Sequence, residues 1–282
     1  GVLGQEFDVP GGWIRPHPGE FLWSDIQPDM DQWDWGRTDW HVQTWQDRRL
    51  AILGTLWPFA SWDQETCHEN DAEVQPVLHR LPTKLFAPCD EKKFVDWLTA
   101  VVERYDGDGV GDMPGLAYPI RHWEVANEPS MQSVYGYFFQ GTPADYLSML
   151  RLAFDTITAA DPEATVLTGG QAGMHSSDTE FWKPVLESAA DAFHVGNIHS
   201  IGSDHSFFSD DYRAFLDETG HSGVEYWITE ALVPTRPEPG QKVPTSDELG
   251  RNTLTGYATA LADGASRIFN VGPHDPTGGP GP

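Results

Sequence analysis

The stretch Trp123-Glu124-Val125-Ala126-Asn127-Glu128-Pro129 decides how this chain is expected to fold. An apolar strand predicted from Ile120 to Ala126 ends here on Asn127 and Glu128. Pro129 then stops the strand, because proline has no N–H to donate to a sheet. In a barrel of parallel strands, side chains at the carboxyl ends of the strands face a common mouth. We therefore expect Asn127 and Glu128 to lie at such a mouth.

The rest of the chain repeats short apolar runs that alternate with longer segments of helical period. This alternation is typical of a parallel sheet with crossover helices, and 282 residues suit a one-domain (β/α)8 TIM barrel of the α/β class. The predicted strands are Trp13 to Arg15, Leu50 to Leu56, Ile120 to Ala126, Ala164 to Thr168, Phe193 to Ile198, Val224 to Thr229 and Ser266 to Val271. The predicted helices are Asp39 to Arg49, Glu91 to Tyr105, Pro143 to Ala160, Thr179 to Ala190, Asp210 to Thr219 and Ser246 to Asp263.

The two ends of the chain fit a regular barrel less well. Residues 1 to 12 offer a first strand, but only Pro10-Gly11-Gly12 separates it from Trp13, far short of the roughly ten residues that a crossover needs. A Pro/Gly-rich run stands where a last helix is expected. We therefore expect a catalytic barrel over 1–272, irregular or abbreviated at the first strand and helix and at the last helix, and a tail or linker over 273–282.

The charge balance excludes two classes of partner. The formal net charge is -26 and the pI is about 4.5, so nucleic acid and anionic membranes would be repelled. No stretch approaches the roughly 18 consecutive apolar residues of a membrane span. We expect a soluble protein that binds neither nucleic acid nor a membrane, and the oligomeric state stays open.

The only cysteines, Cys67 and Cys89, lie in one irregular segment rich in Pro, Asp and Glu. A bridge between them would close a loop of about 20 residues. We predict this disulfide, and with it a secreted or extracellular location. The alternative, two unpaired thiols in a reducing cytosol, stays open because the sequence shows no signal peptide.

A second apolar strand, predicted from Val224 to Thr229, also ends on a single carboxylate, Glu230. One such glutamate is more often a solvated or salt-bridged group than a catalytic one. Two of them, brought to one face by different strand ends, are the minimum apparatus for glycoside hydrolysis. One carboxyl group donates a proton, and the other attacks the sugar or activates water. Glu128 and Glu230 are therefore the candidate catalytic residues.

Over most of its length the chain resembles the clan A glycoside hydrolases, nearest to families 39 and 5. The resemblance rests on Asn127-Glu128-Pro129 and on Thr229-Glu230. In that clan the Asn-Glu pair closing the fourth strand holds the acid/base, and a glutamate closing the seventh strand is the nucleophile. This implies retaining cleavage of β-linked oligo- or polysaccharides, without a cofactor. Both glutamates fall on those strands if Trp13 to Arg15 is the second strand.

The resemblance also implies substrate-binding roles for Arg15, Asn127 and His199. A guanidinium near the nucleophile keeps it ionised, and an imidazole can hydrogen-bond the nucleophile or the sugar. Asn127 would bind the sugar 2-hydroxyl. The plainer alternatives are a surface ion pair for Arg15 and a satisfied strand-end histidine for His199.

The sequence departs from the clan pattern at two places. Many members have a tyrosine two residues after the sixth-strand histidine, where this chain has Ile201. The eighth strand commonly ends on a tryptophan, whereas here it runs to Asn270, Val271 and Gly272. Both differences argue against an ordinary exo-acting substrate.

Tryptophan is abundant, with 12 residues, and the apolar faces of sugars pack on aromatic rings. Trp57 closes the predicted third strand and is a candidate for the mouth. Trp62, in the loop that follows, fits a sugar platform or loop packing equally well. Trp123 lies deeper in its strand and is expected in the core.

The run from Asp106 to Asp112 has acidic residues separated by glycines, which is similar to a Ca²⁺-binding loop. Asp106, Asp108 and Asp112 are the candidate ligands. The twelfth position, where such a loop has a glutamate, is Ala117, so an acidic turn after the preceding helix is the favoured interpretation.

Two rival functions remain open. A metal-dependent barrel hydrolase could draw ligands from the 11 histidines, but no metal-binding histidine motif is present. A barrel that binds polysaccharide without cleaving it would share the fold. Chelation would test the first alternative, and reducing-sugar release from a glycan panel would test the second.

Overall fold

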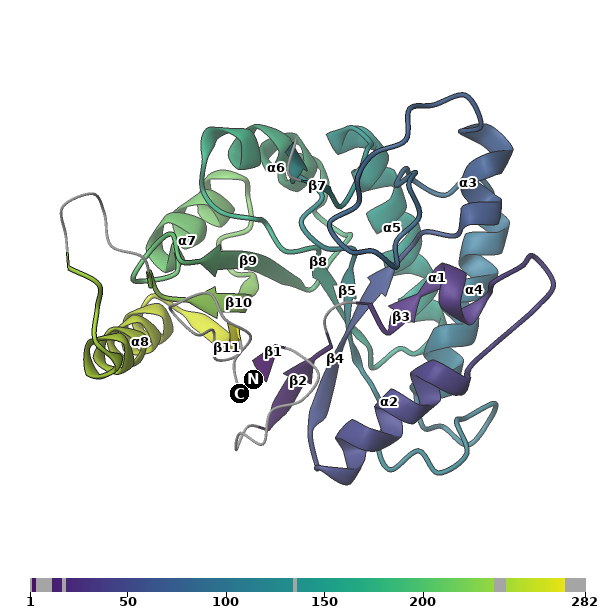
Figure 1. Cartoon of the computed structure of the whole chain (residues 1–282), viewed down its shortest axis with the longest axis horizontal. Helices are drawn as coiled ribbons and strands as arrows, with labels where there is room; N and C mark the ends of the chain where they lie inside the picture. Colours follow the sequence, from purple (N-terminus) through teal and green to yellow (C-terminus); the bar gives the residue numbers. More distant parts are fainter. Residues whose placement is uncertain (1, 4–11, 17–18, 134–135, 236–241, 272–282) are drawn as a thin grey trace.

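The computed structural model describes residues 2–3, 12–16, 19–133, 136–235 and 242–271. Within this part, parallel strands pair in a ring, which confirms the barrel (Figure 1). In pairing order the strands are β1 (Val2–Leu3), β2 (Trp13–Arg15), β4 (Ala51–Trp57), β5 (His122–Val125), β8 (Thr165–Thr168), β9 (Val195–Ile201), β10 (Glu225–Leu232) and β11 (Ala265–Val271), which pairs with β1.

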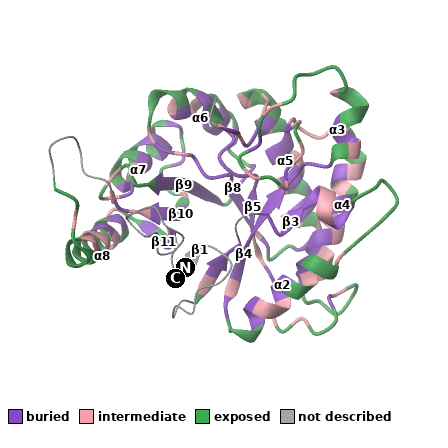
Figure 2. Cartoon of the chain, in the orientation of Figure 1, coloured by how far each residue is buried: buried purple, intermediate pink, exposed green. Residues whose placement is uncertain are grey.

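Helices connect successive strands from β2 onward and cover the outside of the barrel. They are α2 (Gly36–Asp47), α4 (Glu91–Tyr105), α5 (Pro143–Ala160), α6 (Ser176–Ser188), α7 (Ser209–Glu218) and α8 (Ser246–Ala262). Figure 2 shows the strands buried and the outward faces of the helices exposed. All six predicted helices are confirmed to within three residues at either end.

The second position of the barrel is divided between two short strands. β2 pairs with the start of β4, Trp13 opposite Ala51, whereas β3 (Phe21–Leu22) pairs with its end, Phe21 opposite Leu56. The irregularity expected at the first strand and helix therefore extends to the second strand position of the barrel. The link from β1 to β2 lies mostly outside the described residues, and the predicted tail over 273–282 lies wholly outside them, so the domain limits stay a prediction.

Helix starts follow local capping chemistry. Thr142 accepts an N–H bond from Asp145, whose carboxylate bonds back to the Thr142 N–H, and Pro143 fits the first turn because its missing donor is not needed there. α8 begins with the same arrangement. Its cap is Thr245 rather than Ser246, because the Thr245 hydroxyl accepts the bond from the Glu248 N–H.

Inward-facing side chains of the strands form two layers. Leu53, Leu167, Val195, Trp227 and Phe269 make an apolar cluster against Trp13. Residues two positions further along a strand face the same way, and here they are polar: Thr55 follows Leu53, and Asn197 follows Val195. The apolar layer excludes water below, and the polar layer leads up to the mouth.

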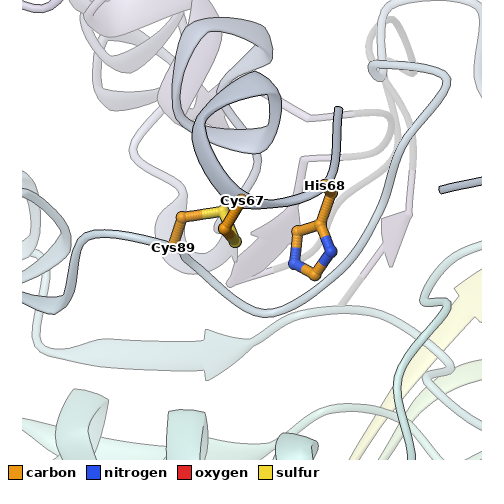
Figure 3. A group of neighbouring side chains, drawn as sticks. All are labelled: Cys67, His68 and Cys89. Carbon is orange, nitrogen blue, oxygen red and sulfur yellow. A yellow bond between two sulfur atoms is a disulfide. The ribbon is translucent and has the colours of Figure 1, made fainter. Parts of the chain in front are cut away.

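A disulfide joins the segments on either side of a surface loop. Cys67 ends α3 (Ser61–Cys67), and Cys89 lies just before α4, with a sulfur–sulfur distance of 2.03 Å (Figure 3). Asp63 of α3 is buried and accepts N–H bonds from Cys89 and Asp90, each at 2.9 Å. The predicted pairing is confirmed.

No helix of the described residues is long and apolar enough to cross a membrane.

Replacing both cysteines, in Cys67→Ser/Cys89→Ser, should lower the free energy of unfolding by about 3 kcal/mol. The bridge spans 22 positions, and its loss returns loop-closure entropy to the unfolded chain. Urea denaturation measures the change, and thiol titration of denatured, unreduced wild type should find no free thiol. Two titratable thiols per chain would show that the bridge is absent.

Candidate active site

The two candidate glutamates come from the expected strands. Glu128 is the third residue after the end of β5, the fourth strand of the ring, and Glu230 lies in β10, the seventh. Arg15 ends β2, and His199 lies in β9, the sixth strand. Because the carboxyl ends of parallel strands meet at one end of a barrel, the four side chains converge there, together with Asn127.

The distances place the glutamates around one imidazole. His199 Nδ1 lies 2.8 Å from Glu128 Oε1 and 3.7 Å from Glu230 Oε1. One carboxylate oxygen of each glutamate lies within 4.8 Å of one of the other. An oxygen–oxygen approach of this size is compatible with the roughly 5 to 5.5 Å between the carboxyl groups of retaining glycosidases.

Arg15 is fully buried and uses three guanidinium nitrogens. Nη1 donates to Glu230 Oε1 at 2.6 Å, Nη2 to Asn127 Oδ1 at 2.5 Å, and Nε to Glu124 Oε2 at 2.7 Å. Burial lowers the pKa of Arg15, but Glu124 and Glu230 outweigh it and raise the pKa above its usual value. Arg15 is therefore a permanent cation inside the barrel and not a surface ion pair.

His199 is also fully buried and carries a charge at neutral pH. Burial lowers its pKa, but Glu230, Glu124 and Glu128 outweigh that effect and raise the pKa to about 9. The imidazolium can donate from both nitrogens, Nδ1 to Glu128 and Nε2 to Thr229 Oγ1, each at 2.8 Å. His199 thus joins the acid/base candidate to the strand of the nucleophile candidate.

The backbone around Glu128 adopts an unusual conformation. Ala126 has φ 65° and Glu128 has φ 40°, in the left-handed region that side-chain-bearing residues avoid. Each such residue costs on the order of 1 kcal/mol or more and persists where surrounding contacts enforce it. Here Ala126 N–H donates to Leu56 O, and Met131 N–H donates to Glu128 O. Strain of this kind clusters at functional sites.

Glu124, for which the sequence predicted no role, lies in the polar layer and bonds several of its members. It is fully buried and accepts bonds from Arg15 Nε, from Thr55 Oγ1 at 2.5 Å and from Asn197 Nδ2 at 2.5 Å. Burial raises the pKa of Glu124, but Arg15 and His199 outweigh it and hold the pKa near about 2. A charged residue inside an apolar strand was the signal that could have found it.

The aromatic candidates pack within the protein. Trp57 is fully buried against Phe138, with ring centroids 5.8 Å apart, so its ring is not exposed at the mouth, and its substrate-binding role stays a prediction. Trp62 packs edge-on against Trp23 and donates its indole N–H to Gln27 O at 2.9 Å, which favours loop packing. Trp123 is fully buried, as predicted.

The acidic run after α4 lies at the other end of the barrel, because it leads into the start of β5. Carboxylate oxygens of Asp106, Asp108 and Asp112 lie within 4.8 Å of one another. Asp112 accepts N–H bonds from Gly107 and Gly109, as an acidic turn would. Burial raises the pKa of Asp106 to about 6, and the nearby charge of Asp108 acts in the same direction. The Ca²⁺ site stays a prediction.

The main site is poorly suited to a metal ion. Glu128, His199 and Glu230 could each offer one ligand atom. Arg15 Nη1, however, lies 2.6 Å from Glu230 Oε1, and His199 is itself cationic at neutral pH. A divalent cation there would face the fixed positive charge of Arg15 and would also have to displace a proton from His199.

Gly170→Ala should displace His199 and lower kcat by about 100-fold, as misplacement of a catalytic group by about 1 Å can do. A Cβ at position 170 would lie 2.0 Å from His199 Nε2, so the ring has to move. Gly250→Ala, in α8 with open space around it, is the matched control and should keep wild-type kcat. Wild-type kcat in Gly170→Ala would show that the position of His199 does not matter.

Comparisons with known proteins bear on the fold. No protein-family model and no curated protein matches the sequence. Among solved structures, a glucosidase from Croceicoccus marinus matches with TM-score 0.63 and 17% identity over 92% of this chain and 53% of its own. A family 39 glycoside hydrolase from Bacteroides cellulosilyticus WH2 matches with TM-score 0.59 and 14% identity, over 94% and 52%. The xylanase XynB from Paenibacillus barcinonensis matches with TM-score 0.60 and 14% identity, over 93% of this chain and 77% of its own.

The barrel fold of this chain is similar to that of these glycoside hydrolases. It resembles the family 39 member among them, as the sequence predicted. This chain spans about half the length of the first two matches, at 53% and 52%. The clan A fold accounts for the arrangement of the barrel, while the roles of individual residues rest on the geometry described above.

Proposed function

We propose that this protein is a glycoside hydrolase that cleaves β-linked oligo- or polysaccharides with retention of anomeric configuration. Glu230 is the nucleophile and Glu128 the acid/base. The observation that carries the proposal is the convergence of these two carboxylates, from the fourth and seventh strands, to within 4.8 Å around His199. Carboxylates this close favour direct attack by one of them over activation of a water molecule, which needs a wider separation.

In the first half-reaction a Glu230 oxygen bonds to the anomeric carbon from the α face. The bond from that carbon to the glycosidic oxygen breaks, and protonated Glu128 gives its proton to the departing oxygen. In the second half-reaction Glu128, now a carboxylate, takes a proton from water. The water oxygen bonds to the anomeric carbon from the β face and releases Glu230. Each step inverts the anomeric centre, so the product keeps the β configuration.

The neighbouring groups support these roles. Arg15 Nη1 donates to Glu230 Oε1 at 2.6 Å and so holds that carboxyl group in position for attack. Asn127 Oδ1 is occupied by Arg15, whereas its Nδ2 is buried and has no hydrogen-bond partner among the described residues. A buried, unsatisfied donor costs free energy, which a bound hydroxyl would recover. Asn127 is therefore placed to donate to the sugar 2-hydroxyl.

The neighbours' names suggest which sugars to try first. They are a glucosidase and a xylanase, so β-glucans and xylans are the first substrates to test.

The disulfide favours an oxidising compartment, and on that ground we propose that the protein acts outside the cytosol.

Purified protein should release reducing sugar from at least one member of a panel of β-glucans, xylans, mannans and aryl β-glycosides. Proton NMR of the first product should show the β anomer, and EDTA should leave the rate unchanged. The α anomer would indicate inversion, and loss of activity in EDTA would favour a metal-dependent hydrolase. Binding to glycans with no product would indicate a barrel that binds without cleaving.

A further inference from the structure

We propose that Glu124 is a positioning residue that orients Arg15 and shares its charge, so that Arg15 presents one nitrogen to Glu230 and another to Asn127. This inference rests on the proposed function, because it assigns Glu124 a part in aiming the nucleophile. Glu124 does not act on the sugar itself. It lies within β5, four residues before Glu128, in the polar layer beneath the mouth.

The geometry of a guanidinium makes one anchored nitrogen decisive. Its donors lie in one rigid plane, so fixing Nε fixes the directions of both Nη groups. Glu124 holds Nε at 2.7 Å, and the other two nitrogens then reach Glu230 at 2.6 Å and Asn127 at 2.5 Å. Without Glu124 the plane could rotate about the Arg15 side chain, and these two contacts could not both be kept.

Glu124 is itself immobilised. Thr55 of β4 and Asn197 of β9 each donate to it at 2.5 Å, and Thr229 of β10 lies within 3.4 Å. The groups that hydrogen-bond Glu124 are all donors, and they reach both of its carboxylate oxygens. A side chain at this position must therefore have two acceptor atoms. A carboxylate meets that demand, whereas an amide would turn one N–H₂ group toward other donors.

The charge of Glu124 also affects Glu230, because both carboxylates pair with Arg15. Among the described residues, the titratable groups that act on Glu124 are Arg15 from β2, His199 from β9 and Tyr146 from α5, and β4 contributes the neutral Thr55. Glu230 from β10 shares Arg15 with Glu124. With Glu124 ionised, Arg15 is shared between two carboxylates. With Glu124 neutral, Arg15 would pair with Glu230 alone. Glu230 would then meet the whole guanidinium charge, which holds its electrons more tightly and makes it a weaker nucleophile.

The test compares Glu124→Gln, Glu124→Asp and a control, Asp63→Asn. Asp63, in α3, is also a fully buried carboxylate that accepts several bonds, and its donors are Gln64 Nε2 and the N–H groups of Cys89 and Asp90. Glu124→Gln should lower kcat by about 100-fold with little change in KM, and should move the acid limb of the pH profile of kcat/KM to lower pH. Glu124→Asp keeps the charge and retracts the carboxylate, so kcat should fall while the limb stays in place. Asp63→Asn should lose stability alone.

A second readout does not depend on activity. In ¹⁵N-histidine-labelled protein, Glu124→Gln should lower the pKa of His199, because one of the groups that raise it has lost its charge. The His199 signal is assigned by its loss in His199→Asn. If wild type cleaves no glycan, the proposed function fails, and this titration still decides whether Glu124 contributes its charge. If wild type is active, an unmoved acid limb in folded Glu124→Gln overturns the positioning proposal alone. If Glu124→Gln does not fold, wild-type kcat in Glu124→Asp overturns it.

Discussion

Glu230→Ala is expected to abolish turnover of every glycoside, with kcat lower by on the order of 10⁵-fold or more, because the nucleophile takes part in both half-reactions. Activated aryl glycosides should not escape the loss, since their better leaving group removes only the need for a proton. Initial rates on an aryl β-glycoside and on a natural glycan measure the effect. Glu225→Ala, at the exposed other end of β10, is the matched control and should keep wild-type activity.

Azide gives the Glu230 variant a stereochemical readout. The anion can occupy the space that the carboxylate leaves and attack the anomeric carbon once, from the α face. The product should be an α-glycosyl azide, formed from an activated substrate and identified by NMR. A β-azide, or substantial residual activity without azide, would mean that Glu230 is not the nucleophile.

Glu128→Ala should behave differently on the two substrate classes. Cleavage of natural glycans should fall by about 10²- to 10⁴-fold, because the leaving oxygen no longer receives a proton. An activated aryl glycoside needs no such proton, so the first half-reaction should survive. The second half-reaction lacks its base, and the glycosyl-enzyme should accumulate. A burst of aryl alcohol and intact-protein mass spectrometry measure both effects.

Azide should rescue the Glu128 variant, since it attacks the glycosyl-enzyme without a general base. Attack from the β face yields a β-glycosyl azide, the opposite anomer to that from the Glu230 variant. Glu163→Ala, which removes an exposed carboxylate near the start of β8, should show neither burst nor rescue. An α-azide from Glu128→Ala would mean that Glu128 is the nucleophile and Glu230 the acid/base. Absence of rescue in both variants would contradict both assignments.

Most of the fold could be predicted because its determinants are local. The helix from Glu91 to Tyr105 has the predicted bounds, since apolar periodicity and an Asp90 cap lie within the segment itself. The short β3 and the hairpin of β6 (Gln132–Ser133) and β7 (Gly136–Tyr137) escaped prediction, because strands of two residues carry no period. The accessibility of Trp57 depends on Phe138, which is distant in sequence, so it could not be foreseen.

The sequence by itself determined that this chain forms a (β/α) barrel, that Glu128 and Glu230 lie at or near the carboxyl ends of its fourth and seventh strands, and that Cys67 and Cys89 can pair. Apolar periodicity, strand-ending residues and cysteine spacing are properties of short segments, so they can be recognised before folding is known. Only the tertiary structure decided how far apart the two carboxylates lie and which cation each one meets. It also turned Glu124, one charged residue in an apolar strand, into the buried partner of Arg15, 109 positions away. Such contacts arise when the ring of strands closes and burial strengthens every interaction between charges inside it.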